Sequence, residues 1–247
     1  LPRVLSLSKV SHQELIEDLY WRMRNYGFRD SAASAVSSIA LALRDIASKR
    51  KETTFHRYHG ATQDSCLVYG SGGGINLSLS DLLVEMEELA ALSCGVVKMK
   101  VKPNPDDWTP AYERIKAVRQ HLGPSVKLAF DINQLLSVEH ALEFAQVVAD
   151  LDIAWFEEPV HSADLVALRQ FCQQSPIPVA LGESERTGRV FPMIHEMGAR
   201  HMQPQVHKMG KVSEWFEVRD MCKNNGLQIS CGGIAPLAAQ MICLLYT

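Results

Sequence analysis

The sequence of 247 residues lacks the features that mark secreted, membrane and nucleic-acid-binding proteins. Its six cysteines form no CxxC pair, which argues against a disulfide framework and against a zinc site. No basic run is longer than KRK at 49–51, and the formal net charge is −3, so neither a nucleic acid nor an anionic membrane is expected as partner. No apolar stretch approaches the roughly 20 residues that cross a bilayer, and residues 1–20 lack the order of a signal peptide. We therefore expect a cytoplasmic protein that acts on small molecules.

What the sequence does contain is typical of an enzyme. It is 47% hydrophobic and 21% charged, which suits one large α/β barrel or two modest domains. The chain begins at Leu1 without a methionine and ends inside an apolar helical pattern. From these two ends we expect a truncated chain.

The pattern of the chain changes near residue 60. Before it, apolar spacing predicts helices at 12–26 and 31–50, with Ser31 or Ser34 as N-cap of the second. After it, short β-rich runs alternate with amphipathic helical stretches. The expected strands are 65–70, 96–102, 126–132, 153–158, 178–182, 200–206 and 227–231. The expected helices between and after them are about 78–94, 108–121, 137–151, 163–174, 187–197, 212–225 and 235–246.

Seven successive β-then-α units predict a parallel sheet with right-handed crossovers. So many units favour closure into a TIM-type (β/α) barrel over a doubly wound sheet. An eighth strand is not found in the sequence. We therefore expect a barrel domain at 63–247 that lacks its last strand, preceded by a separate, mainly helical domain at 1–62.

Three acids recur at the ends of three successive predicted strands. Asp131, Glu157 and Glu183 are evenly spaced by one βα unit, so we expect them at equivalent heights at the carboxyl end of the barrel, where active sites of this fold lie. Each alone could cap a helix or line a solvated rim. Three converging carboxylates repel one another, and a hard divalent cation such as Mg²⁺ is the usual resolution.

Two lysines lie on the strand before these acids. Because side chains alternate along a strand, Lys98 and Lys100 are predicted to face the barrel interior while Met99 faces the helices. A strand-end lysine is often merely solvated, but beside a metal its ammonium form is disfavoured and it can act as a base. The predicted chemistry is removal of the proton α to a substrate carboxylate, with the metal stabilising the enediolate.

Four short motifs together resemble those of the enolase superfamily, and within it the mandelate racemase and muconate lactonizing enzyme branch. They are KMK at 98–100, DIN at 131–133, WFEEP at 155–159 and LGES at 181–184. The helical pattern at 34–49, followed by the turn into VYGSGG at 68–73, resembles the N-terminal capping domain of that branch. The resemblance covers nearly the whole chain and implies that 1–62 is a truncated capping domain.

The resemblance also implies roles for individual residues. Asp131, Glu157 and Glu183 would bind Mg²⁺, Lys100 would be the proton-abstracting base, and Lys98 and Asn133 would hold or polarise the substrate carboxylate. The expected partner is a small carboxylate substrate, and we expect the chain to form a homo-oligomer.

Two positions depart from the pattern of the family. Gln205 stands where the family usually has Asp or Lys, and Cys231 stands where its Asp-His dyad has histidine. Because glutamine transfers no protons, a second base is missing, and Gln205 and His207 are expected to bind substrate, with His207 available as an acid.

The leading hypothesis is dehydration of a sugar acid, which needs only one base. The alternatives are a racemase, epimerase or cycloisomerase acting on a carboxylate, and a degenerate family member that binds metal and ligand without turnover.

Overall fold

In the computed structural model, which describes residues 11–26 and 30–246, the chain divides into two compact units. One, which we call the strand unit, comprises 67–181 and 193–201. The other, which we call the helical unit, contains the rest of the described chain. The expected domain boundary between residues 62 and 63 stays a prediction.

The strands follow the chain in their hydrogen-bonded order, from β1 to β7, and the pairings from β1 to β5 are all parallel. They are β1 (Gly70–Gly72), β2 (Val96–Lys100), β3 (Lys127–Asp131), β4 (Ile153–Glu157), β5 (Val179–Leu181), β6 (His201–Met202) and β7 (Gln228–Ile229). The α/β class with a parallel sheet is thus confirmed.

Helices alternate with these strands. Those after β1 are α5 (Leu79–Leu92), α6 (Thr109–Leu122), α7 (Val138–Val147), α8 (Leu165–Gln174), α9 (Phe191–Met197), α10 (Val212–Asn225) and α11 (Ala235–Ile242). Short 3-10 helices are η2 (Ala149–Leu151), η3 (Gly188–Val190) and η4 (Cys243–Tyr246). The first part of the chain forms α2 (His12–Arg22), η1 (Arg24–Tyr26), α3 (Asp30–Arg50) and α4 (Phe55–Tyr58). None of the helices within the described residues is long and apolar enough to cross a membrane.

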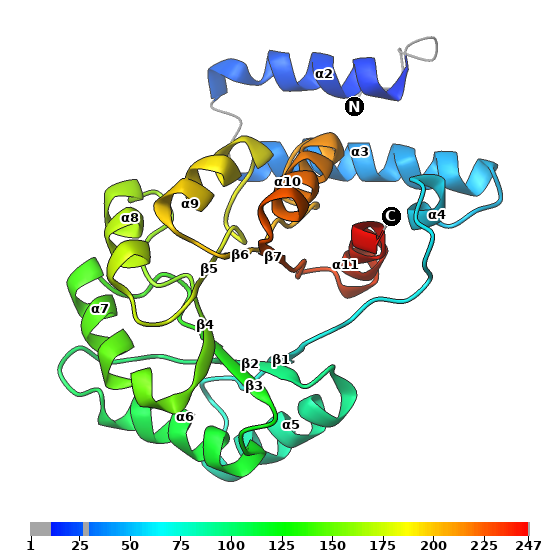
Figure 1. Ribbon diagram of the computed structural model, residues 1–247. Helices are drawn as coiled ribbons and strands as arrows, with labels where there is room; N and C mark the ends of the chain where they lie inside the picture. The colour runs from blue at the N-terminus through cyan, green and yellow to red at the C-terminus, as the bar shows by residue number, and fades with distance from the viewer. Residues whose placement is uncertain (1–10, 27–29, 247) are drawn as a thin grey trace. The chain divides into compact units, whose positions relative to one another are not determined.

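One face of the strand unit packs against its helices. Met99, Phe130 and Phe156 are Cα partners across β2, β3 and β4, and the rings of Phe130 and Phe156 lie 4.4 Å apart between centroids. Phe130 also meets Phe144 of α7 at 5.7 Å, and Phe156 meets Phe171 of α8 at 5.2 Å. Figure 1 shows α5 to α8 along the outer side of these strands. The prediction that Met99 faces the helices is therefore confirmed.

The opposite face of the strands is lined by small residues around one large ring. Ala129 and Ala180 are fully buried and form a cluster with Trp155. Because alanine occupies the positions on either side, the indole of Trp155 has room to lie across the inner face. The next inward positions toward the carboxyl ends of β3 and β4 are the polar residues Asp131 and Glu157.

The structure differs from the sequence expectations at the first strand. The apolar run at 65–70 predicts a strand there, but β1 begins only at Gly70. Leu67 and Val68 are 71% and 51% exposed, so these two side chains cover no core. Apolar character alone does not make a strand where no neighbouring strand pairs with it.

Three further differences concern helices. α3 begins at Asp30, so Ser31 and Ser34 lie inside the helix and are not its N-cap; the carbonyl oxygen of Ser34 instead accepts a hydrogen bond from Ser38 Oγ at 2.9 Å. The pattern at 137–151 is divided into α7 and η2, and α4 was not expected.

Gly73 supplies a test of how tightly the strand unit is packed. Its φ is +66°, and a Cβ there would lie 2.6 Å from Met99 Cβ and 3.0 Å from Met99 Cα. Gly95 has a similar φ of +78°, but a Cβ at that position would have no atom within 4 Å. Gly95→Ala should therefore cost only the left-handed backbone penalty of about 1–2 kcal/mol. Gly73→Ala should lower the free energy of unfolding by the same backbone penalty and by about 1–3 kcal/mol more from overpacking. The free energy of unfolding is measured by urea denaturation. Equal losses of stability in the two variants would contradict the close packing of Gly73 against Met99.

Candidate active site

The candidate site begins with three residues that are Cα partners at the carboxyl ends of adjacent strands. Lys100, Asp131 and Glu157 end β2, β3 and β4 and lie side by side in register. They follow Met99, Phe130 and Phe156 by one residue, so strand alternation turns them to the inner face. Lys98, two residues earlier on β2, shares that face.

Each lysine contacts a carboxylate. Lys98 Nζ donates to Glu157 Oε1 and lies 3.5 Å from Asp131 Oδ2. Lys100 Nζ donates to Asp131 Oδ2, and also to Asn133 Oδ1 at 2.9 Å. The prediction that both lysines face the interior is confirmed by these contacts.

The two lysines differ in their access to solvent. The side chain of Lys98 is 6% exposed and that of Lys100 is 35% exposed, whereas Asp131 and Glu157 are fully buried. Lys98 is therefore enclosed by its carboxylates, and Lys100 is the one whose ammonium a substrate can reach.

The charges in this cluster shift the pKa values of its members. Burial opposes the charged form of Lys98, but the negative charges around it, above all Glu157, outweigh burial and raise the pKa of its ammonium group. Burial also opposes the charged form of Asp131, but Lys98 and Lys100 outweigh it and lower the pKa of its carboxyl group. Both groups are therefore ionised at neutral pH.

Trp155 and His201 complete the surroundings of this cluster, and neither was predicted from the sequence to have a role. Trp155 Nε1 donates to Glu157 Oε2 at 3.0 Å, which fixes the carboxylate that Lys98 contacts. The ring of His201 lies 4.6 Å from that of Trp155. The signal for Trp155 was its position two residues before Glu157, which places it on the same face of β4.

His201 makes stability depend on pH. Burial, with a smaller contribution from the charge of Lys98, lowers the pKa of His201 from 6.5 to about 4. The unfolded chain therefore binds a proton below pH 6.5 that the native protein binds only below about pH 4. The free energy of unfolding should fall by about 3 kcal/mol through this residue as the pH falls across that window.

The measurement is urea unfolding from pH 7 to pH 4 in the presence of a chelator. His201→Gln should flatten the pH dependence, while His161→Gln, at an exposed loop histidine, should leave it unchanged. An unaltered slope in His201→Gln would refute this origin of the pH dependence.

The other three predicted site residues lie in the helical unit. Glu183 follows β5 by two residues, and Lys208 Nζ lies 3.3 Å from its Oε1 and donates to its carbonyl oxygen at 3.1 Å. Gln205 and His207 both lie against Gly233, where a Cβ would overlap the His207 ring and come within 2.9 Å of Gln205 Oε1. The structure thus brings Lys98, Lys100, Asp131, Asn133 and Glu157 together in one unit and Glu183, Gln205 and His207 in the other. The roles of all eight stay predictions.

The chemistry of Gln205 and Cys231 agrees with a missing second base at these two positions, whereas His207 is a neutral imidazole. Gln205 is 4% exposed, and its Oε1 has no hydrogen-bond partner among the described residues. Burial, with the charge of Lys208, lowers the pKa of His207. Burial raises the pKa of the Cys231 thiol to about 11, so Cys231 carries its proton at neutral pH and offers no thiolate.

The donor set at the strand ends suits a hard divalent cation. Asp131 and Glu157 present buried carboxylate oxygens from adjacent strands, and two ammonium groups balance their charge. Oxygen ligands of this kind are those that Mg²⁺ takes in proteins.

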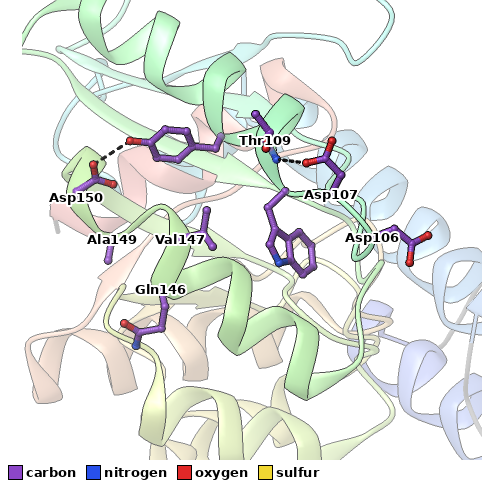
Figure 2. A pocket seen from close by; sticks show the side chains of 9 residues that line it. Asp106, Asp107, Thr109, Gln146, Val147, Ala149 and Asp150 are labelled. Atoms are coloured by element: carbon purple, nitrogen blue, oxygen red, sulfur yellow. Dashed lines mark hydrogen bonds between the residues drawn. The ribbon is translucent and has the colours of Figure 1, made fainter.

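A groove elsewhere in the strand unit holds none of these residues. It has a volume of about 800 Å³ and lies between α6 and the end of α7 (Figure 2). Two of its carboxylates already accept hydrogen bonds, Asp107 from Thr109 N and Asp150 from the Tyr112 hydroxyl, each at 3.0 Å. Its lining residues are Asp106, Asp107, Trp108, Thr109, Tyr112, Gln146, Val147, Ala149 and Asp150. Because none of these lining residues is buried, the strand ends remain the candidate active site.

The family follows from comparison with known proteins. The family model described as enolase C-terminal domain-like matches residues 81–246, more than half of the chain. The chain therefore belongs to this family, and the resemblance to the enolase superfamily is confirmed. Its structural neighbours include a mandelate racemase/muconate lactonizing protein from Paracoccus denitrificans.

Individual relatives differ in their reactions. The chain is 27% identical over 232 residues to a 3,6-anhydro-alpha-L-galactonate cycloisomerase of Streptomyces coelicolor and, again over 232 residues, to an arabinonate dehydratase of Saccharolobus solfataricus. These alignments cover 93% and 90% of this chain but 63% and 62% of those proteins. A racemase from Streptomyces coelicolor A3(2) crystallised with magnesium has a TM-score of 0.86 and 26% identity, covering 95% of this chain and 70% of that one.

Proposed function

We propose that this protein removes the proton α to a carboxylate in a Mg²⁺-dependent reaction that passes through an enediolate, and that its substrate is a sugar acid that loses water. The observation that carries the proposal is the alignment of Lys100, Asp131 and Glu157 at the carboxyl ends of three adjacent strands. A base and two carboxylates at one end of a parallel α/β sheet are the groups that this reaction needs.

The metal ligands in this proposal are Asp131, Glu157 and Glu183, each of which offers one carboxylate oxygen. Asp131 and Glu157 are adjacent partners, and Glu183 follows β5, the strand that pairs with β4. Bound Mg²⁺ would supply the positive charge that stabilises the enediolate.

Three residues of this chain have separate roles in the proposed reaction. Lys100 takes the α-proton in its neutral amine form, because its side chain is partly exposed and that of Lys98 is enclosed. Lys98 keeps Asp131 and Glu157 in place and adds positive charge near the substrate carboxylate. Asn133, whose side chain is exposed and contacts Lys100, hydrogen-bonds the substrate.

Two positions at which the family usually has a second base favour loss of water over racemisation in this chain. Racemisation needs proton transfer on both faces of the α-carbon, and neither the Gln205 amide nor the protonated Cys231 thiol supplies a second base. The arabinonate dehydratase among the relatives supports dehydration. Cycloisomerisation or racemisation is the second candidate, supported by the cycloisomerase and by the Streptomyces racemase.

The test is incubation of the protein with Mg²⁺ and a panel of sugar acids in D₂O, followed by NMR. We expect a 2-keto-3-deoxy product that carries solvent deuterium at C3, and deuterium exchange at the α-carbon of recovered substrate from one configuration only. Rapid uptake from both configurations without loss of water would favour a racemase or epimerase. Metal and ligand binding without any exchange would overturn the proposal and indicate the degenerate alternative.

A further inference from the structure

Three residues near the lysines have an unusual backbone conformation. Asn133 and Gln134, which follow β3, have φ values of +49° and +65°, and Glu158, which follows β4, has a φ of +47°. Asparagine enters the left-handed region with some ease, but glutamine and glutamate seldom do. A residue kept in this region is held there by its surroundings, and such residues concentrate at functional sites.

Hydrogen bonds between Gln134 and Glu158 keep these residues in the left-handed region. The Gln134 backbone N–H donates to the Glu158 carbonyl oxygen at 2.8 Å, and Gln134 Nε2 donates to Glu158 Oε1 at 3.0 Å. On its other side, Gln134 Oε1 accepts from Ser162 N at 2.8 Å. Glu158 is only 4% exposed, so water competes little for these bonds. These hydrogen bonds therefore connect the loop after β3 to the loop after β4.

Asn133 connects these two loops to Lys100 by hydrogen bonds. The Asn133 backbone N–H donates to Asp131 Oδ1 at 2.8 Å, and Asn133 Oδ1 accepts from Lys100 Nζ at 2.9 Å. Asn133 Nδ2 lies 3.5 Å from Glu158 Oε2, at the outer limit of hydrogen bonding. Asn133 Nδ2 also lies 3.4 Å from Asp131 Oδ2, so the carboxylates of both Glu158 and Asp131 hold the Asn133 amide.

We propose that Glu158 and Gln134 form a latch that positions Asn133 and, through it, the ammonium group of Lys100. Glu158 is in this view a positioning residue that acts through Asn133. The inference rests on the proposed function for the role of Lys100 as base, whereas the latch itself is a property of the loops and is measured separately from activity.

The experiment compares two substitutions of Glu158 with one control. Glu158→Leu removes both acceptor oxygens, while Glu158→Gln keeps an acceptor for Gln134 Nε2. Glu143→Leu replaces an exposed glutamate of α7 and controls for the loss of a carboxylate. We expect Glu158→Leu to lower kcat for α-proton exchange about 10- to 100-fold, as for other residues that orient functional groups, and to raise KM by a smaller factor, because Asn133 also hydrogen-bonds the substrate. Glu158→Gln should keep most of the activity, and Glu143→Leu all of it.

A crystal structure of Glu158→Leu supplies the readout that does not depend on activity. We expect Asn133 and Gln134 to leave the left-handed region and Asn133 Oδ1 to move away from Lys100. If the wild type shows no exchange, the proposed function fails while this structural result still decides the latch. Unchanged backbone angles in Glu158→Leu, a wild-type rate, or equal losses in Glu158→Leu and Glu158→Gln would each overturn the inference. Should Glu158→Leu fail to fold, Gln134→Ala removes the same side-chain bond from the other end and is judged by the same outcomes.

Discussion

Replacing Lys100 by alanine is expected to lower α-proton exchange by about 10²- to 10⁴-fold, the contribution of a positioned proton-transfer group. Its ammonium group lies between Asp131 and Asn133, and no second base stands at Gln205 or Cys231. The substitution should also leave Mg²⁺ affinity unchanged or slightly higher, because a cation that competes for Asp131 is gone. Exchange is followed by NMR in D₂O and metal binding by calorimetry.

The matched control is Lys102→Ala, because Lys102 is an exposed lysine two residues beyond Lys100. It should retain full activity. Wild-type exchange in the Lys100→Ala protein would show that another group removes the proton, and Lys98 would be the first residue to test. Loss of metal binding together with activity would mean that Lys100 maintains the carboxylates instead of acting as the base.

Replacing Lys98 by methionine is expected to produce a large loss of stability in metal-free protein. The substitution keeps the length of the side chain but leaves the buried carboxylate of Glu157 without its ammonium partner. Removing one partner of a buried ion pair costs about 3–5 kcal/mol, because the remaining charge stays in a medium of low polarity. The free energy of unfolding is measured by urea denaturation with a chelator present.

Two comparisons sharpen this result. Lys127→Met, at the exposed first residue of β3, should change stability little. Adding Mg²⁺ should restore more stability to the Lys98→Met protein than to the wild type, because the cation replaces the missing positive charge. A Lys98→Met protein as stable as wild type in chelator would show that the carboxylates do not need this lysine.

The sequence predicted the part of the site that depends on strand geometry alone. Lys98, Lys100, Asp131 and Glu157 were found because alternation along a strand and the spacing of βα units fix which side chains share a face and a height. These rules need no knowledge of side-chain contacts. The structure accordingly confirms the inward lysines and the helix-facing Met99.

The features that the sequence did not predict depend on contacts between distant segments. The left-handed conformations of Gln134 and Glu158 arise from hydrogen bonds between two loops, and nothing in either residue type favours them. β1 was misplaced because Leu67 and Val68 look like core residues until their exposure is known. The placement of loop side chains such as His207, for which substrate binding stays a prediction, is likewise determined by no periodic pattern.

The alternation along β2, β3 and β4 also has an evolutionary consequence. Neighbouring residues such as Phe130 and Asp131 lie on opposite faces, one among the helices and one at the reacting end. Selection for a stable interior and selection for chemistry therefore act on different positions of the same short strand. A lineage can exchange the residues of the strand-end loops without repacking the aromatic layer of Met99, Phe130 and Phe156. The varied reactions of the relatives at about one-quarter identity are what such separation permits.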